Sequence, residues 1–227
     1  MKTCVIWDLD GTLAHAHGIW SKALLHAAQK VLPRHLWPDI DSLKAANRGR
    51  YIWDRPFENN RAFVNEAFWE EMFRRFFLTY RLLGLSPSAA LRAMPYIREH
   101  ILDMDNYTLY PDAKEALGNC VSKGARCLLL SNNYPEAERV LYALGIREYF
   151  SGVFISGVCG YDKPRPEFFA MAMESCPQSR YIMVGDNLKA DILGARAMGI
   201  TSVYVHRQPS PLADYCFPDL SGIPELL

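Results

Sequence analysis

The amino-acid sequence predicts an α/β fold in which a parallel sheet carries an all-helical block inserted after its first strand. Two observations predict the sheet: a short apolar run near the N-terminus, and apolar runs that alternate with helical patterns beyond residue 110. A third observation predicts the insertion, because residues 15–105 keep a helical periodicity. With 227 residues, the chain is long enough for one large or two small domains.

The composition is that of an ordinary globular protein and narrows the choice of partners. The 25 basic residues balance the 25 acidic ones, and no basic run appears, which argues against nucleic acid or an anionic membrane as the main partner. The six cysteines are scattered and form no C-x-x-C pair, which suits a reducing compartment. No signal peptide or membrane-spanning run is recognisable, so we expect a cytoplasmic protein, either a monomer or a homodimer.

The first predicted strand covers residues 4–7 and ends in two acids, Asp8 and Asp10. The run is almost wholly apolar and too short for a helix, as expected of a strand buried in a parallel sheet. Its carboxyl end is where open α/β sheets place their ligand crevices. Two neighbouring carboxylates repel, so they require a cation, a shared proton or a division of work between nucleophile and proton carrier. The alternative is a solvated Asp-Gly turn.

The following segment predicts helices and no strand. Helical patterns cover residues 19–31 and 60–83, and Ser86-Pro87 opens a third helix towards His100. In the second helix, apolar residues four apart form a stripe that favours helix-to-helix packing over a pocket lining: Val64, Phe68, Met72 and Phe76. The insertion follows strand one directly, so it is placed to act as a lid over the two acids.

Strands and helices alternate in the remaining chain. Strands are expected at 126–130, 153–156, 181–184 and 201–205, and helices at 112–123, 135–144, 166–176 and 188–198. Such alternation implies right-handed crossovers and a parallel sheet covered on both faces.

Polar residues follow these strands and could meet in one crevice. Ser131 and Asn132 end the second strand, Lys163 follows the third, and Asp186 ends the fourth, with Asp191 in the next helix. Each has an ordinary explanation alone, as a turn residue, a solvated charge or a helix cap. Their shared position at one edge of the sheet favours a functional site.

These residues carry a resemblance to a known family. Asp8-Leu9-Asp10-Gly11-Thr12, Ser131, Lys163 in Lys-Pro-Arg-Pro, and residues 185–191 resemble the four ordered motifs of the haloacid dehalogenase (HAD) superfamily. The insertion resembles the helical type-one (C1) cap of phosphoglycolate phosphatases and β-phosphoglucomutases. The resemblance implies a Rossmann-like core of residues 1–14 and 106–227, with strand order 5-4-1-2-3, and a cap of residues 15–105.

The resemblance also implies a role for each motif residue. Asp8 would attack phosphorus in line and form an aspartyl phosphate. Asp10 would protonate the leaving alkoxide and then deprotonate the hydrolytic water. Ser131, Asn132 and Lys163 would bind the phosphoryl oxygens.

A metal site is implied beside these groups. The Asp8 carboxylate, the Asp10 backbone carbonyl and Asp186 would hold Mg²⁺, which prefers hard oxygen ligands. Asp191 would lie outside the metal ligands and orient Lys163 or a metal-bound water.

Asp10 separates two kinds of reaction within the resemblance. Dehalogenases lack this second aspartate, since a leaving halide needs no proton, whereas phosphatases and phosphomutases retain it. We therefore expect a Mg-dependent phosphomonoester hydrolase acting on a small phosphorylated metabolite. The alternatives are a phosphomutase of the β-phosphoglucomutase type and a non-catalytic binding protein that keeps the fold.

Four residues of the insertion have less definite expectations. His15 replaces an acid or amide common in the family, and His15 and His17 could bind metal or substrate, although a polar hinge is favoured. Arg48 and Arg50 flank a glycine in an expected loop and are candidates for gripping an anionic substrate, the alternative being solvated surface arginines.

Overall fold

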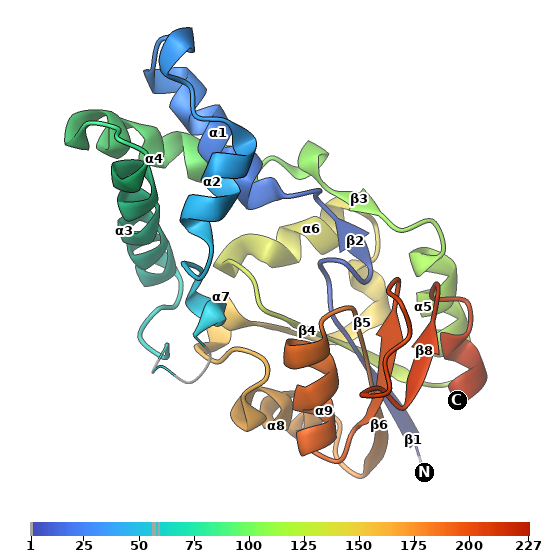
Figure 1. Ribbon diagram of the computed structural model, residues 1–227. Coiled ribbons are helices and arrows are strands. Elements are labelled where there is room, and N and C mark those ends of the chain that lie inside the picture. The colour runs from blue at the N-terminus through green and yellow to red at the C-terminus, as the bar shows by residue number, and fades with distance from the viewer. Residues whose placement is uncertain (1, 56–57, 59) are drawn as a thin grey trace.

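A computed structural model (Figure 1) describes residues 2–55, 58 and 60–227. At its centre a parallel six-stranded sheet has the order β5-β4-β1-β6-β7-β8. The strands are β1 Lys2–Trp7, β4 Arg126–Ser131, β5 Phe150–Ile155, β6 Ser179–Gly185, β7 Thr201–Val205 and β8 Tyr215–Phe217. The predicted α/β class is confirmed, and the five expected strands lie in the expected order. Strand β8 adds a sixth, at an edge, which the sequence analysis does not predict.

Strand β1 lies in the middle of the sheet because its side chains are apolar on both faces. Val5 and Trp7 belong to the hydrophobic cluster on one face, and Cys4 and Ile6 to the cluster on the other, as the two-residue repeat of a strand requires. Pairing continues to the end of the strand, where the Asp8 N–H donates to the carbonyl of Val184 over 3.0 Å. Asp8 is thereby fixed at the carboxyl edge of the sheet.

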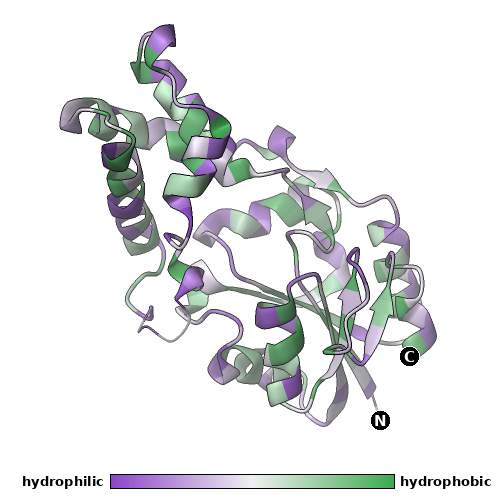
Figure 2. Cartoon of the chain, in the orientation of Figure 1, coloured by the Kyte–Doolittle hydropathy of each residue, from purple (hydrophilic) through white to green (hydrophobic). Residues whose placement is uncertain are grey.

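Four helices, with the described residues between them, form a group that we call the helical block: α1 Ile19–Val31, α2 Ile40–Asn47, α3 Glu66–Leu82 and α4 Pro87–Ile101. They pack on one another beside the carboxyl edge of the sheet (Figure 1). Figure 2 shows hydrophilic and hydrophobic residues alternating around α3. Its buried face contains Phe68, Met72 and Phe76, so the predicted stripe packs in the core.

The helices begin and end close to the expected residues, with local exceptions. Helix α1 has the predicted bounds, and α4 begins after Ser86, whose hydroxyl caps the Ala89 N–H. Helix α3 begins at Glu66 rather than at residue 60, and Val64 precedes it. Among the described residues, no helix is both long enough and apolar enough to cross a membrane.

Two short strands connect the helical block with the sheet. β2 Ala14–His15 pairs antiparallel with β3 Thr108–Leu109, so the chain enters and leaves the block side by side (Figure 1). The expectation of no strand in this segment is therefore wrong at His15, because the exit of the chain supplies a partner that local sequence does not reveal. The domain boundaries, 1–14 with 106–227 and 15–105, remain a prediction.

The remaining helices cover the sheet. They are α5 Ala113–Ser122, α6 Glu138–Ala143, α7 Ser156–Cys159, α8 Pro166–Glu174 and α9 Gly194–Ala197. The segment expected as one helix over 188–198 begins with a π-helical stretch, Leu188–Leu193. Widened turns of this kind are frequent at functional sites, and this one carries Asp191.

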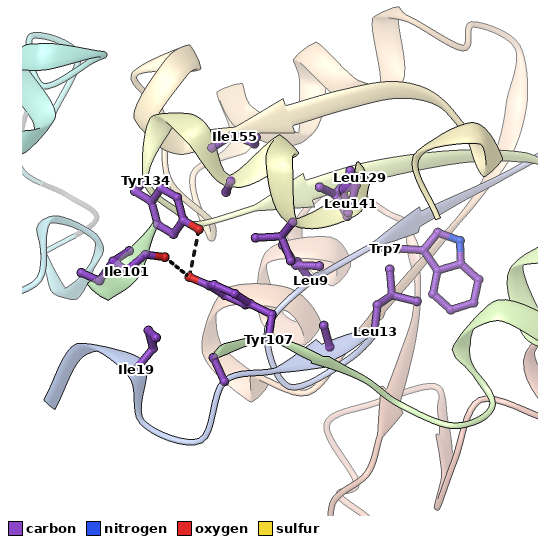
Figure 3. Close-up of a cluster of buried hydrophobic side chains, with 14 of the residues drawn as sticks. Trp7, Leu9, Leu13, Ile19, Ile101, Tyr107, Leu129, Tyr134, Leu141 and Ile155 are labelled. Carbon is purple, nitrogen blue, oxygen red and sulfur yellow. Dashed lines mark hydrogen bonds between the residues drawn. The ribbon is translucent and has the colours of Figure 1, made fainter. Parts of the chain in front are cut away.

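A buried cluster joins the helical block to the sheet (Figure 3). The Tyr107 hydroxyl donates to the carbonyl of Ile101 over 3.0 Å and accepts from the Tyr134 hydroxyl over 2.9 Å. Leu9 lies beside Tyr107, and Leu13 lies on the side of Trp7. Burial raises the pKa of both tyrosines. The cluster thus holds the loop after β1 against the loop after β4.

Candidate active site

The carboxyl ends of β4, β1 and β6 open into a cavity of about 310 Å³. Its lining contains all seven residues predicted from the core motifs: Asp8, Asp10, Ser131, Asn132, Lys163, Asp186 and Asp191. The helical block contributes Trp53 and Asp54. Parallel strands place their carboxyl ends at one edge, which is why distant motifs converge here.

The Lys163 ammonium binds two carboxylates and is almost fully buried. Its Nζ lies 2.6 Å from Asp8 Oδ1 and 2.7 Å from Asp191 Oδ1. Burial alone would lower the pKa of Lys163, but Asp191 and Asp8 raise it overall and keep the amine charged. Burial raises the pKa of Asp8, and the Lys163 contact opposes that rise and favours the carboxylate form.

Asp10 has a different partner. Its Oδ2 accepts a hydrogen bond of 2.6 Å from the side-chain amide of Asn133. Burial raises the pKa of Asp10 to about 6, and the Asn133 bond limits this rise. A carboxyl group that titrates near neutrality can both give and take a proton. Sequence reasoning missed Asn133, although its place directly after Ser131-Asn132 was the available signal.

Asn132 lies in the cavity, but its side chain is engaged with the Lys163 backbone. Nδ2 donates to the Lys163 carbonyl over 2.9 Å, and Oδ1 accepts from the Lys163 N–H over 2.7 Å. This reciprocal pair fixes the Lys163 loop against β4. A phosphoryl contact from Asn132 would therefore come from its backbone N–H, beside the buried hydroxyl of Ser131.

Three acids form a cluster with the chemistry of a divalent cation site. Carboxylate oxygens of Asp8, Asp186 and Asp191 all lie within 4.8 Å of one another. Such a hard oxygen set suits Mg²⁺. Burial raises the pKa of Asp186 and repulsion by Asp191 adds to it, while an ion pair with Arg207 opposes the rise. The mutual repulsion of these groups is what a bound cation would relieve.

The cluster contains two of the predicted metal ligands, Asp8 and Asp186, and adds the Asp191 carboxylate. The third predicted ligand is the backbone carbonyl of Asp10. The carboxylate of Asp10 is held by Asn133, so Asp10 could contribute to a metal site through its backbone carbonyl. Asp191 is fully buried, with Oδ1 on Lys163 and Oδ2 accepting from the Asn187 N–H over 3.0 Å. These contacts agree with a role in orienting Lys163.

Two glycines leave room for the acids. A Cβ at Gly11 would lie 2.4 Å from Asp186 Oδ2, and Gly11 has a φ of +85° that side chains rarely adopt. A Cβ at Gly185 would lie 2.3 Å from Asp191 Oδ2. Both positions therefore require glycine for the carboxylates to stay where they are.

The helical-block residues proposed to reach the substrate lie outside this cavity. Arg48 lines another cavity of about 320 Å³ near the end of α2, which shares Asp54 with the cavity around Asp8. Arg50 turns back to donate to the Ala46 carbonyl over 2.8 Å. The arginines thus stay at the end of α2 and do not meet the acidic cluster. His15 and His17, with ring centroids 3.8 Å apart, line a second cavity that adjoins the first at Asp10.

Comparisons with known proteins agree with this site. Residues 2–199 match the family described as haloacid dehalogenase-like hydrolase. A phosphoserine phosphatase from Thermus thermophilus is 31% identical over 206 residues, which are 88% of this chain and 73% of that protein. The haloacid dehalogenase-like hydrolase domain-containing protein 3 of Xenopus laevis is 25% identical over 224 residues, covering 95% and 88% of the two chains.

Solved structures show the same fold. The HAD-hydrolase YfnB from Bacillus subtilis, bound to magnesium, aligns with a TM-score of 0.74 at 21% identity, over 100% of this chain and 98% of that one. With the family match spanning residues 2–199 and the ordered motifs meeting in one cavity, the chain belongs to the haloacid dehalogenase-like hydrolase family.

Proposed function

We propose that the protein is a Mg²⁺-dependent phosphomonoester hydrolase that acts on a small phosphorylated metabolite through a phosphorylated Asp8. One observation carries the proposal: Asp8 and Asp10 line the same cavity but have different partners, Lys163 for Asp8 and Asn133 for Asp10. Two carboxylates in different environments suit the roles of nucleophile and proton carrier. The phosphoserine phosphatase relative supports phosphomonoester chemistry by its name.

In the first step, Asp8 attacks the phosphorus of the substrate. Lys163 occupies Oδ1 of Asp8, which leaves Oδ2 as the attacking oxygen. As the new bond forms, the bond from phosphorus to the leaving oxygen breaks, and its electron pair stays on that oxygen. Protonated Asp10 gives its proton to this oxygen, so the leaving group departs as an alcohol.

In the second step, Asp10 works in reverse. Its carboxylate takes a proton from water, whose oxygen attacks the phosphorus of the aspartyl phosphate. The bond between phosphorus and Asp8 breaks, inorganic phosphate leaves, and Asp8 returns as a carboxylate while Asp10 returns protonated. The Ser131 hydroxyl, the Asn132 backbone N–H and the Lys163 ammonium bind the phosphoryl oxygens throughout.

Asp8, Asp186 and the Asp10 carbonyl would hold Mg²⁺, which would neutralise charge that builds up on the phosphoryl group. The oxygen donors and close spacing of the acidic cluster support this assignment. The helical block would serve as the cap, since Trp53 and Asp54 line the cavity together with core residues. The balanced charge supports a small-molecule partner, and the scattered cysteines support a cytoplasmic location.

A substrate panel tests the proposal. Wild type and Asp8→Asn are incubated with Mg²⁺ and phosphorylated sugars, acids and nucleotides, and free phosphate and sugar-phosphate isomers are both measured. We expect phosphate release by wild type and a loss of about 10⁴-fold or more in Asp8→Asn, the scale seen when a nucleophile is removed. Isomerisation without release would indicate a phosphomutase. No activity on the whole panel would favour a binding protein.

A further inference from the structure

The second cavity, of about 590 Å³, is placed to receive the leaving group. It shares Asp10, Trp53, Asn132 and Asp186 with the cavity around Asp8. If Asp10 protonates the leaving oxygen, as the proposed function holds, the rest of the leaving group extends into this adjoining space. The volume lies within the range of sites that bind small organic molecules, about 300 to 1,000 Å³.

The helical block presents aromatic rings to this cavity. Trp20, Tyr51 and Trp53, which we call the aromatic wall, all contribute to its lining. Tyr51 and Trp53 are stacked, with centroids 5.3 Å apart and planes inclined by 5°, and the Trp20 centroid lies 5.6 Å from each. Trp53 is also stacked with Phe68 of α3, with centroids 6.3 Å apart, and all three residues of the wall are half-buried and line the cavity. Trp53 alone among them lines both cavities.

The aromatic wall is held in place from behind. The buried guanidinium of Arg75 donates to the Tyr51 carbonyl over 3.0 Å, and its Nε binds Glu71 over 2.6 Å. Trp20 also contacts Phe76 of α3, with centroids 5.9 Å apart. The rings are therefore fixed by helix α3 and do not depend on the substrate for their position.

The helical-block side of the two cavities carries an acid, Asp54, and the histidines His15 and His17 that precede the block line the second cavity. Of the helical-block residues that the structure describes, none lining either cavity is a lysine or an arginine. Arg207, from the core, lines the second cavity and is paired with Asp186. A leaving group with a second phosphate or a carboxylate would find no cation of the helical block there. A planar ring would find stacking partners, which tolerate many ring types.

We propose that the preferred substrates are phosphomonoesters whose leaving group carries a planar heteroaromatic ring, and that this ring stacks on Trp53. Trp53 is then the residue that determines substrate class. Two sources share this chemistry: nucleoside 5′-monophosphates, in which a ribose separates phosphate and ring, and pyridoxal 5′-phosphate, in which one methylene does.

The test compares ring-bearing with ring-free esters. Steady-state kcat/KM is measured for AMP, UMP and pyridoxal 5′-phosphate, and for phosphoserine, glycerol 3-phosphate and phosphoglycolate. We expect wild type to prefer ring-bearing esters by about 10-fold or more, the scale of one stacking contact. The source of the ring is identified by whether the nucleotides or pyridoxal 5′-phosphate give the higher kcat/KM. An equal or higher kcat/KM for the ring-free esters would overturn the proposal.

Three variants test whether Trp53 is responsible for the preference for ring-bearing esters. Trp53→Leu should lower the ratio of ring-bearing to ring-free kcat/KM about 10-fold, through KM, whereas Trp53→Phe should retain most of it. Trp37→Leu is the matched control, because Trp37 is partly exposed beyond α1 and lines neither cavity. An unchanged ratio in Trp53→Leu would contradict the assignment, provided that its circular dichroism and Tm match those of wild type.

Binding separates this inference from the proposed function. Calorimetry of Asp8→Asn with AMP, pyridoxal 5′-phosphate and phosphoserine needs no turnover. If wild type hydrolyses no ester, the proposed function fails. The inference would still be supported if Asp8→Asn binds the ring-bearing esters more tightly than phosphoserine and the double variant Asp8→Asn/Trp53→Leu does not. Hydrolysis without any preference, together with equal binding, overturns the inference alone.

Discussion

Asp10 shows how one neighbouring side chain sets the chemistry of a carboxyl group. Burial pushes its pKa up to about 6, and the 2.6 Å bond from Asn133 limits that rise. A donor to a carboxylate favours the charged form, so the bond also holds Asp10 ready to accept a proton. Asn133 acts on the reaction through the Asp10 carboxylate and is therefore a positioning residue.

Replacing Asn133 tests this role. In Asn133→Ala the carboxylate of Asp10 loses its donor, so its pKa should rise above about 6. We expect kcat to fall about 10- to 100-fold, as for other supporting residues, and the limb of the pH profile that reports Asp10 to move to higher pH. A fall in kcat with an unmoved profile would indicate a purely structural effect.

Gly11 tests the position of Asp186. Gly11→Ala would place a methyl group 2.4 Å from Asp186 Oδ2, so the carboxylate must move. We expect Mg²⁺ affinity, measured by calorimetry, to weaken about 10-fold or more. Gly124→Ala is the control, because Gly124 has a similar φ of +82° with nothing within 4 Å of its Cβ position. Equal Mg²⁺ affinity in the two variants would contradict the assignment.

At the scale of single elements, α3 connects a buried ion pair to the aromatic wall. Glu71 lies 2.7 Å from Arg74 and 2.6 Å from Arg75, and Arg75 also binds the Tyr51 carbonyl. A spacing of four residues by itself would pair Glu70 with Arg74 and Glu71 with Arg75. In the structure Glu71 takes both arginines, because its side chain is nearly buried while Glu70 is exposed.

Glu71 therefore predicts a pH-dependent stability. Hydrogen bonds from Arg74, and then the Arg75 contacts, hold its pKa below the usual 4.5, although burial opposes them. The stabilisation is present above that value and is lost as the pH falls through the lower pKa of the folded state. We expect Glu71→Gln to unfold more easily at pH 7 by about 1–3 kcal/mol, with the difference shrinking below pH 4. The free energy of unfolding is measured by urea titration at each pH, with Glu70→Gln as the control. If the difference between wild type and Glu71→Gln stays constant from pH 7 to below pH 4, the ionic contribution is excluded.

The elements differ in how far the sequence could predict them. The five main strands and helix α1 follow from apolar runs and helical periodicity. Strand β5 is shifted, because it covers Phe150–Ile155 rather than 153–156 and Ser156 begins α7. Strands β2, β3 and β8 have two or three residues each and depend on partners distant in sequence. Short pairings of this kind are decided by tertiary structure and leave no periodic signal.

Some residues of the site could be predicted from the sequence, and others could not. Residues directly after strands, such as Asp8 and Ser131, are placed by the sheet itself, so their convergence follows from topology. Charge and loop position favour Arg48 and Arg50 as substrate contacts, but the side chain of Arg50 binds the Ala46 carbonyl of helix α2. The aromatic wall comes from α1 and the turn at Ile52–Asp54, and their mutual approach depends on packing within the helical block.

At the scale of the whole molecule, the site lies between the helical block and the sheet, and polar contacts join the two. The Asn60 amide donates to buried Asp162 over 2.8 Å. Glu136 accepts from the Trp69 indole over 3.0 Å and pairs with Arg98 at 2.5 Å. These contacts join the helical block to the core beside the cavity, which Trp53 lines together with Asp10.

Metal binding should stabilise the whole protein. The clustered carboxylates of Asp8, Asp186 and Asp191 repel one another when folded and separate on unfolding, so a cation that binds the folded state raises its stability. At a concentration of 100 times Kd we expect Mg²⁺ to add about 2.7 kcal/mol to the free energy of unfolding. EDTA should remove both this gain and the hydrolase activity. An unchanged Tm with Mg²⁺ in wild type would count against the site.

The central claim is that Asp8 carries the phosphoryl group and Asp10 releases it. The most direct measurement uses Asp10→Asn, which can still accept a phosphoryl group from an activated ester but lacks the base for hydrolysis. After incubation with p-nitrophenyl phosphate and Mg²⁺, the protein is quenched in acid and its peptides are mapped by mass spectrometry. We expect phosphate on the peptide that contains Asp8, and none in the double variant Asp8→Asn/Asp10→Asn. Phosphate on another residue would contradict this claim. It would also be contradicted if wild type releases p-nitrophenol and phosphate while neither wild type nor Asp10→Asn carries an adduct on Asp8.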